Sequence, residues 1–396
     1  MTNAILPVYG PPPVVFERGE GVRVYDDKGK AYLDFIAGIA VNSLGHCHPA
    51  LVKALTDQAN KLWHTSNMFR IPGQERLAQR YCDLTFADRV FFTNSGSEAV
   101  DTCLKIARRY QWSQDRKERI GVISFTGSFH GRTFGGINAG GQEKYREGFG
   151  PRMEGFRTLE YGDDEAFKTE IAKPDIAAVI IEPVQGEGGV REVPEERLLM
   201  IRKLCDENGV LLIYDEVQCG AGRTGQLFHH QWVKGAEPEL MACAKGIGGG
   251  FPMGMALASE KAASGMVKGV HGSTFGGNPL AMAVGNAVLD VITGKDFLAN
   301  VRHVAGTLTQ GMESLKDRYP ELVVAVTGRG LLRGLKMKKD PLPLRGLLAE
   351  RGLLVGTAGD NVLRLAPPLI VTENDVREAI DIIDQQLSAM MTAAGA

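Results

Sequence analysis

Two charged residues stand directly after apolar runs, where the strands of an α/β sheet present side chains to a ligand. Asp215 follows the run at 210–214, and Lys245 follows the run at 240–244. Ligands of open α/β sheets bind outside the carboxyl ends of the strands, so Asp215 would face such a site; a helix or loop cap is the alternative. A lysine that leaves a buried strand is costly unless its amine is paired or forms a Schiff base. Taken alone, Lys245 also fits a surface lysine.

Two further segments carry groups that bind anions and aromatic rings. NSGSEA follows a strand-like run and opens a helical pattern, so the amides of Gly96 and Ser97 would point outward as a phosphate site. An ordinary helix N-cap is the alternative interpretation of the same residues. In SFHGR, Phe129 and Arg132 suit ring stacking and carboxylate binding, or a plain surface turn. A phosphate site, an acid, a reactive lysine and a stacking aromatic are together the parts needed to hold pyridoxal phosphate, whose ring nitrogen the acid would keep protonated.

Brief, wholly apolar runs alternate with helical patterns through the middle of the chain. Strands that are apolar on both faces are typical of a parallel sheet covered by helices. The segment 194–208, with Gly209 behind it, has the pattern of a crossover helix and its C-terminal stop. The middle therefore predicts a doubly wound α/β domain with a mostly parallel sheet. Its expected strands lie at 89–93, 119–125, 176–182, 210–216 and 240–246.

The two ends of the chain have a different pattern. GVRVYDD and KAYLDF predict a hairpin near the N-terminus. After about residue 295, strand-like stretches at 331–337 and 362–365 precede a final helix, which has a capping-box-like start at Thr372 and Asp375. A chain of 396 residues is long enough for two domains. We expect a large domain over 48–294 and a smaller α+β domain made of 1–47, which includes an N-terminal arm, and 295–396.

Composition argues against several other classes of protein. With 45 Lys and Arg against 47 Asp and Glu, the chain offers no electrostatic case for nucleic acid or an anionic membrane. Nowhere do 18 apolar residues run together, so no membrane-spanning helix is expected. The six cysteines include no Cys-x-x-Cys pair, and free thiols indicate a reducing cytoplasm. His46, Cys47 and His48 lack further ligands at suitable spacing, so we expect no metal site.

Several long motifs resemble the class III aminotransferases, the ω-amino group of the fold-type I pyridoxal-phosphate enzymes. They are FHGR, IEPVQGEGG, DEVQCGAGRTG, AKGIGGGFPMG and HGSTFGGNPLA, and the resemblance covers nearly the whole chain. It implies a fold-type I architecture, a homodimer with shared active sites, and a cofactor carried by Lys245 with Asp215 at its ring nitrogen. It also assigns to the cofactor Gly96 and Ser97 at the phosphate, Phe129 and Val217 on the ring faces, Gln218 at the ring hydroxyl, Glu216 in the same motif, and Thr274 reaching over from the neighbouring subunit.

The same resemblance implies the reaction. The δ-amino group of N-acetylornithine would pass to 2-oxoglutarate by a ping-pong mechanism, giving N-acetylglutamate 5-semialdehyde and glutamate in arginine biosynthesis. Arg132, with Ser273 near it, would bind the carboxylate of acetylornithine, and Arg364 would bind the α-carboxylate of 2-oxoglutarate. Glu187 would neutralise Arg364 for the first substrate and swing aside for the second, because one pocket must accept both substrates in turn.

One departure bears on specificity. Gly38 stands near the position where members that act on free ornithine carry a tyrosine, and a small residue leaves room for an N-acyl group. Succinylornithine and N-succinyl-diaminopimelate remain alternative substrates, since both would use the same Arg132. A homologue that binds the cofactor without turnover is another alternative. The GAGRTG segment at 220–225 suggests a nicotinamide-dependent oxidoreductase, but it does not open a helix directly after its strand.

Overall fold

A computed structural model describes residues 4–10 and 14–395. The rest of the expected N-terminal arm, residues 1–3 and 11–13, lies outside the described residues, as does residue 396. The largest sheet has seven strands in the order β4-β12-β11-β10-β7-β5-β6. These strands are β4 (Arg89–Thr93), β5 (Gly121–Phe125), β6 (Phe156–Leu159), β7 (Ile176–Ile181), β10 (Leu211–Asp215), β11 (Leu240–Cys243) and β12 (Gly254–Ala258).

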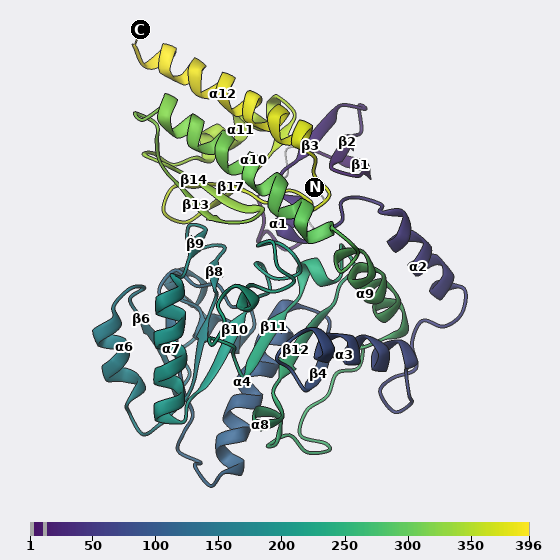
Figure 1. The fold of residues 1–396 in the computed structure, drawn as a ribbon, viewed down its shortest axis with the longest axis vertical. Helices are drawn as coiled ribbons and strands as arrows, with labels where there is room; N and C mark the ends of the chain where they lie inside the picture. The colour runs from purple at the N-terminus through teal and green to yellow at the C-terminus, as the bar shows by residue number, and fades with distance from the viewer. Residues whose placement is uncertain (1–3, 11–13, 396) are drawn as a thin grey trace.

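The expected strands of the middle region are all present, and the pairs β10–β11, β10–β7, β5–β7 and β5–β6 are parallel. β12 is antiparallel to both of its neighbours, and neither β12 nor β6 was expected from the sequence. β5, β7, β10 and β11 are buried along their whole lengths, which explains their unbroken apolar runs. The mixed α/β sheet with a parallel core confirms the predicted fold class, and helices cover it in Figure 1.

The crossover helix α7 (Glu195–Asn208) ends as expected, because Gly209 follows it in the left-handed conformation with φ of 63°. The helix α4 (Gly96–Ser113) begins directly behind β4. The remaining elements of this region are α2 (Pro49–Ala59), α3 (Pro72–Leu84), α5 (Phe134–Ala139), α6 (Asp164–Ile171), α8 (Glu260–Ala263), α9 (Pro279–Ile292), the short strands β8 (Val184–Gln185) and β9 (Arg191–Glu192), and the 3-10 turns η1 (Glu143–Tyr145), η2 (His229–Trp232) and η3 (Lys245–Ile247).

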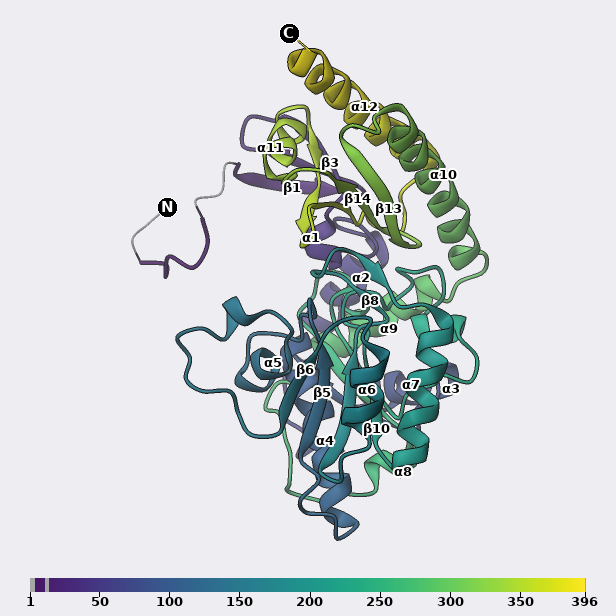
Figure 2. The same ribbon diagram turned by 90° about the vertical axis from the view of Figure 1, so that its left-hand side faces the viewer.

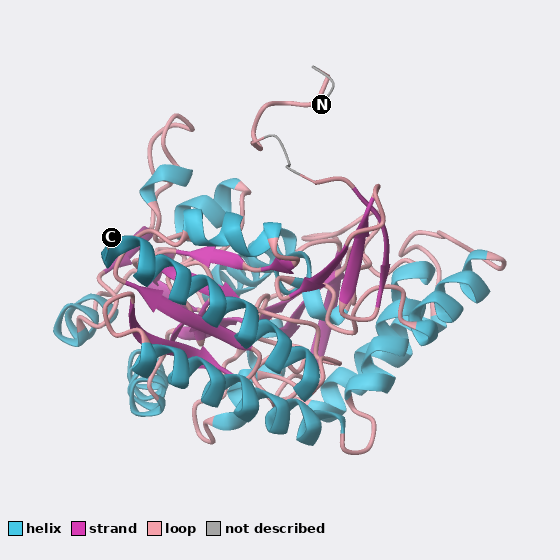
Figure 3. Cartoon of the chain, turned by 90° about the horizontal axis from the view of Figure 1, so that it is seen from above, coloured by secondary structure: helices cyan, strands magenta, loops and turns pink. Residues whose placement is uncertain are grey.

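A four-stranded sheet in the order β13-β14-β17-β16 forms the C-terminal part of the molecule. Two long helices, α10 and α12, pack against each other over this sheet, as Figures 2 and 3 show. The predicted capping box is present, because Thr372 and Asp375 exchange hydrogen bonds between side chain and backbone amide. The elements are α10 (Phe297–Arg318), β13 (Val323–Arg329), β14 (Leu332–Met337), α11 (Leu342–Glu350), β16 (Gly356–Ala358), β17 (Val362–Leu365) and α12 (Glu373–Gly395).

The N-terminal strands join the C-terminal part of the chain. β2 (Arg23–Asp26) and β3 (Ala31–Asp34) form the expected hairpin, β1 (Phe16–Glu20) extends it, and β15 (Leu353–Leu354) pairs in parallel with β3. The turn α1 (Ala37–Ala40) that follows has positive φ at all four residues. None of the helices in the described part of the chain combines the length and apolar character needed to cross a bilayer.

Candidate active site

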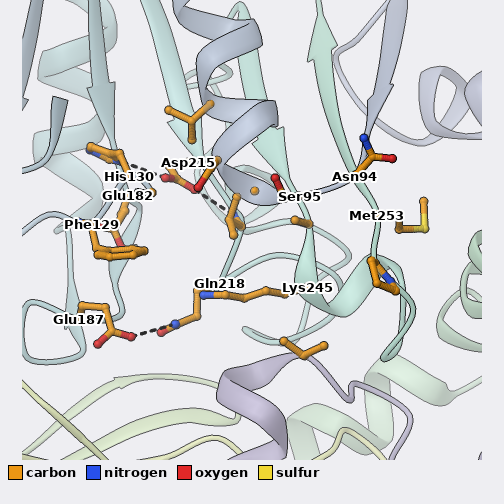
Figure 4. A pocket seen from close by; sticks show the side chains of 18 of the residues that line it. Asn94, Ser95, Phe129, His130, Glu182, Glu187, Asp215, Gln218, Lys245 and Met253 are labelled. Atoms are coloured by element: carbon orange, nitrogen blue, oxygen red, sulfur yellow. Dashed lines mark hydrogen bonds and ion pairs between the residues drawn. The ribbon is translucent and has the colours of Figure 1, made fainter. Parts of the chain in front are cut away.

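A cavity of about 320 Å³ lies where β10 and β11 end and α4 begins. Figure 4 shows that charged and polar side chains from separate loops converge on it. The carboxyl ends of parallel strands form the ligand-binding edge of an open α/β sheet. Of the residues expected from the sequence, the cavity is lined by Gly96, Ser97, Phe129, Glu187, Asp215, Val217, Gln218 and Lys245.

Lys245 is the first residue of η3, one residue beyond the alanine that follows β11. Its φ of 50° lies in the left-handed region, which a side-chain-bearing residue adopts at a cost of roughly 1–3 kcal/mol. Burial lowers the pKa of the Lys245 amine, and the nearby Glu187 carboxylate only partly opposes this shift. A lowered pKa leaves a larger fraction of the amine neutral, which is the form that reacts with a carbonyl group.

Asp215 is hydrogen-bonded to His130, a residue that was not expected from the sequence to belong to the site. Its Oδ2 lies 2.8 Å from Nδ1 of His130, and its Oδ1 accepts a hydrogen bond from the Val217 amide at 3.0 Å. Burial disfavours the charged form of His130, but the hydrogen bond and charge of Asp215 outweigh it, so the pKa of His130 is raised. His130 therefore positions the Asp215 carboxyl group through a buried hydrogen bond, next to the place where a cofactor ring nitrogen would lie.

A third buried acid, Glu182, lies beside this pair. It follows β7, and its carboxylate accepts hydrogen bonds from the amides of Phe129 and Gly186 at 2.8 and 3.0 Å. Burial raises the pKa of Glu182, and the negative charge of Asp215 adds to the shift while His130 opposes it. Glu182 therefore fixes the backbone of the loop that carries Phe129, the aromatic residue expected to stack on the cofactor ring.

The start of α4 forms an anion-binding cradle. The Ser95 hydroxyl accepts a hydrogen bond from the Glu98 amide, which caps the helix and leaves the first-turn amides of Gly96 and Ser97 without intrahelical acceptors. The Ser97 hydroxyl accepts a hydrogen bond from the Arg132 amide at 3.2 Å, so the FHGR loop lies against this helix start. Gly131 makes this approach possible, since an added Cβ would lie 2.5 Å from the Ser97 hydroxyl oxygen.

We expect Gly131→Ala to weaken cofactor binding by about tenfold or more, because a Cβ here displaces Ser97 from the cradle. The change also places alanine at a φ of 112°, which is strained in itself. Gly150→Ala is the matched control, since Gly150 has a φ of 93° and nothing within 4 Å of the added Cβ. Spectrophotometric titration of each apoprotein with pyridoxal phosphate measures the effect, and equal affinities would contradict the proposed cradle.

Arg364 and Glu187 form an ion pair at the side of the cavity nearest the C-terminal sheet. Arg364, on β17, is only 4% exposed, and its Nη1 donates to Glu187 Oε1, to the Gly186 carbonyl and to Gln218 Oε1. Burial alone would raise the pKa of Glu187, but the Arg364 charge outweighs it and the pKa is lowered. Glu187, which lines the cavity, therefore masks the charge of a guanidinium that lies outside the lining but close enough to Lys245 to act on its charge.

Five of the expected residues lie outside the cavity lining, and Arg364, described above, is one of them. The Glu216 carboxylate accepts hydrogen bonds from the amides of His229 and His230, and so it is directed away from Asp215. Arg132 is exposed, with its guanidinium 3.5 Å from the centre of the Tyr145 ring and 5.1 Å from that of Phe129. Ser273 touches the cavity edge through Asn94, and Thr274 beside it is exposed.

His130 lies in the FHGR motif and Glu182 ends an apolar run, but neither residue was expected from the sequence to have a role in the site. The segment 220–225, the dinucleotide-binding alternative, forms turns after β10 and opens no helix. Within the described residues, no group of three or more His, Cys, Asp or Glu side chains is arranged to hold a metal ion.

The side chains present fit pyridoxal phosphate. A buried amine with a lowered pKa, a buried carboxylate and the open amides of a helix start border one cavity, and Phe129 and Val217 line it as well. Lys245 would hold the carbonyl group, Asp215 the ring nitrogen, and Gly96 with Ser97 the phosphate.

Comparisons with known proteins identify the family of the chain. Residues 6–387 match the family described as aminotransferase class-III. The chain is 55% identical to the acetylornithine aminotransferase of Mesorhizobium japonicum, over 96% of this chain and 95% of that protein. It is 52% identical to acetylornithine aminotransferase 2 of Caulobacter vibrioides, over 99% and 97% of the two chains.

Solved structures give the same result. The N-acetylornithine aminotransferase of Stenotrophomonas maltophilia matches with a TM-score of 0.85 and 38% identity, over 97% of this chain and 98% of that one. The ornithine aminotransferase of Toxoplasma gondii matches with a TM-score of 0.94 and 30% identity, over 98% and 94%. The chain belongs to the class III aminotransferases, and it is a pyridoxal-phosphate-dependent transaminase of fold-type I.

Proposed function

We propose that this transaminase moves the δ-amino group of N-acetylornithine to 2-oxoglutarate, forming N-acetylglutamate 5-semialdehyde and glutamate in arginine biosynthesis. The observation that carries the proposal is the Arg364–Glu187 pair beside Lys245. A masked guanidinium suits an enzyme that must accept a 2-oxo diacid in one half-reaction and an ω-amine in the other. The names of the relatives, acetylornithine aminotransferases at 52–55% identity, support the same substrate.

The proposed roles follow from where the side chains lie. Pyridoxal phosphate, when bound, supplies an electron sink that stabilises negative charge at the amine-bearing carbon of the substrate. Lys245 Nζ, once released by the incoming amine, would take a proton from that carbon and return one during the transfer. Asp215, held by His130, would keep the ring nitrogen protonated, and Gln218 would orient the ring from beside Glu187.

Arg132 would bind the α-carboxylate of acetylornithine. Its guanidinium already lies over two aromatic rings at the loop that carries Phe129, so only its outer edge is left for a ligand. When 2-oxoglutarate enters, Glu187 would leave Arg364, which then binds the α-carboxylate through its planar fork. The two substrates would therefore share Lys245 and differ in which arginine is engaged.

The acyl group would occupy the space beside α1. Gly38 lies in the left-handed turn with φ of 64°, and an added Cβ there meets Asn42 at 3.4 Å and Val41, a residue of the cavity wall, at 3.6 Å. A tyrosine at this position would reach into the volume that an acyl group needs. Succinylornithine and N-succinyl-diaminopimelate place a longer acyl group there and remain the alternative substrates.

We expect the wild-type enzyme to have a higher kcat/KM for N-acetylornithine than for succinylornithine, ornithine or N-succinyl-diaminopimelate. Gly38→Tyr should lower kcat/KM for N-acetylornithine by about 10- to 200-fold, because steric mismatch in a pocket costs roughly 1–3 kcal/mol. Gly38→Ala is the matched control, since it introduces the same backbone strain without the bulk. Steady-state kinetics with the four amines measures this, and a wild-type preference for free ornithine would contradict the proposal.

The proposal includes a homodimer in which Thr274 reaches the phosphate of the neighbouring active site. Large apolar side chains of the 63–69 segment, and Phe275 next to Thr274, are exposed on the single chain: Trp63, Met68, Phe69 and Phe275. The Asn67 side chain donates to the carbonyl groups of Ser273 and Gly276, which joins these two loops into one surface. An exposed apolar patch of this kind is typical of a surface that another protein covers.

We also infer that the enzyme works in the cytoplasm, with small molecules as its substrates and without nucleic acid or membrane partners. All six cysteines are free thiols, as is usual in a reducing compartment. Four of them, Cys103, Cys205, Cys219 and Cys243, are buried in the core, so oxidation of these thiols would disturb its packing.

A further inference from the structure

A second cavity, of about 440 Å³, lies between α10, the β13–β14 turn and the loop region at 224–232. We call it the arginine crevice, because three arginines line it: Arg302 from α10 and Arg329 and Arg333 from the hairpin. It shares no lining residue with the active-site cavity. Elements of the C-terminal part of the chain form one wall, and Glu192, Thr224 and Trp232 form the other.

The positive charge of the crevice is only partly neutralised. Arg329 pairs with Glu192 and Glu195 and stacks on Trp232, so carboxylates of the protein neutralise its charge. Arg302 and Arg333 donate only to backbone carbonyl groups: Arg302 to Gly225 at 2.7 Å, and Arg333 to Gly330 at 3.2 Å and to Gly328. Within the described residues, neither of these two arginines has a carboxylate at ion-pair distance.

Arg333 is half-buried, whereas Arg302 is exposed. Desolvation and the charge of Arg329 lower the pKa of the Arg333 guanidinium, and the carboxylates of Glu192 and Glu313 compensate only in part. Glu192 also pairs with Arg329 and His229. A partly buried cation without a carboxylate partner is destabilising, and an anion that enters the crevice beside Arg333 removes this penalty. The fork of an arginine matches the oxygens of carboxylates and phosphates.

The wall of the crevice also leaves space for a ligand. Gly306 lies inside the 22-residue helix α10, where glycine costs about 1 kcal/mol relative to alanine. No atom lies within 4 Å of a Cβ added at Gly306, so packing does not require a glycine at this position. Thr224 lines the opposite wall, is 1% exposed, and its hydroxyl has no hydrogen-bond partner within the described residues.

We propose that the arginine crevice binds a small anion with several carboxylate or phosphate oxygens, held by Arg302 and Arg333. The anion replaces the missing carboxylate partners of these two arginines, and Thr224 borders the same space. Because the crevice is bounded by α10 and the β13–β14 hairpin on one side and by Glu192 and the 224–232 region on the other, the ligand bridges two parts of the chain.

Calorimetric titration of the holoenzyme with citrate, and separately with inorganic pyrophosphate, tests the proposal. We expect at least one of the two probes to bind saturably, at one site per chain. Binding should be about tenfold weaker or more in Arg333→Met and in Gly306→Leu, which remove a charge and fill the space, respectively. Affinity should stay unchanged in Arg351→Met, which removes an arginine that follows α11, donates to Gln385 and does not line the crevice, and in Gly306→Ala, which adds only a methyl group.

The outcomes separate the crevice from the active site and the two anion types from each other. Tighter citrate binding assigns carboxylates, and tighter pyrophosphate binding assigns phosphates. If Gly306→Leu melts well below the wild type, Arg302→Met takes its place in the comparison. The proposal is overturned if neither probe binds saturably, if the crevice variants bind like the wild type, or if Arg364→Ala removes the binding, which would locate it in the active site.

Discussion

Lys245→Ala is expected to abolish transamination, with kcat falling by about 10⁴-fold or more. Lys245 is the residue expected to bind the cofactor covalently and to move the proton, and no second lysine lines the active-site cavity among the described residues. Neither function therefore has a substitute. Stopped-flow measurement of each half-reaction, with N-acetylornithine and then with 2-oxoglutarate, should show that both steps are lost.

Borohydride reduction followed by peptide mapping gives a second readout that does not depend on turnover. The wild-type holoenzyme should yield a reduced cofactor on the peptide that contains Lys245, and the variant should yield none. Lys261→Ala is a suitable control, because Lys261 is a half-exposed lysine on α8 whose amine pairs with Glu239. A reduced adduct on another lysine of Lys245→Ala would show that the assignment of Lys245 is wrong.

Arg364→Ala should impair the 2-oxoglutarate half-reaction by about 10²-fold or more, because truncating one partner of a buried charge pair costs roughly 2–5 kcal/mol. Arg364 is 4% exposed, and the change also leaves the Glu187 carboxylate buried without its partner. The acetylornithine half-reaction should change much less, since that substrate is expected to use Arg132. Rapid mixing of each form of the cofactor with its own substrate separates the two effects.

Glu187→Gln tests the other side of the same pair. It keeps a side chain of similar size but removes the charge that masks Arg364, so we expect the 2-oxoglutarate half-reaction to be retained and the acetylornithine half-reaction to weaken. Equal losses in both half-reactions of Arg364→Ala would overturn the proposed switch. An unchanged acetylornithine half-reaction in Glu187→Gln would show that the mask is not needed.

Local signals in the sequence account for most of the fold and part of the site. The buried strands could be predicted because apolar residues continue on both faces, and Asp215 and Lys245 could be located because each follows such a run. β6 could not, since only its first residue is fully buried, and β12 follows a glycine-rich stretch without a clear strand start. The antiparallel pairing of β12 with β11 depends on the tertiary arrangement of the sheet, which no local sequence pattern indicates.

Contacts between distant segments are what the sequence could not supply. His130 and Asp215 are 85 residues apart, and their pairing depends on β5 and β10 being separated by only one strand. The orientation of Glu216, by contrast, could have been predicted locally, because successive side chains along a strand point in opposite directions. Asp215 faces the cavity, and Glu216 consequently meets the backbone of His229 and His230.

The most direct test of the proposed reaction is a single turnover with one substrate at a time. Holoenzyme mixed with N-acetylornithine alone should release one equivalent of N-acetylglutamate 5-semialdehyde per chain and then stop. Later addition of 2-oxoglutarate should release one equivalent of glutamate and restore the original visible spectrum. Semialdehyde that forms only when both substrates are present, or that forms at the same rate with Lys245→Ala, would contradict the proposed mechanism.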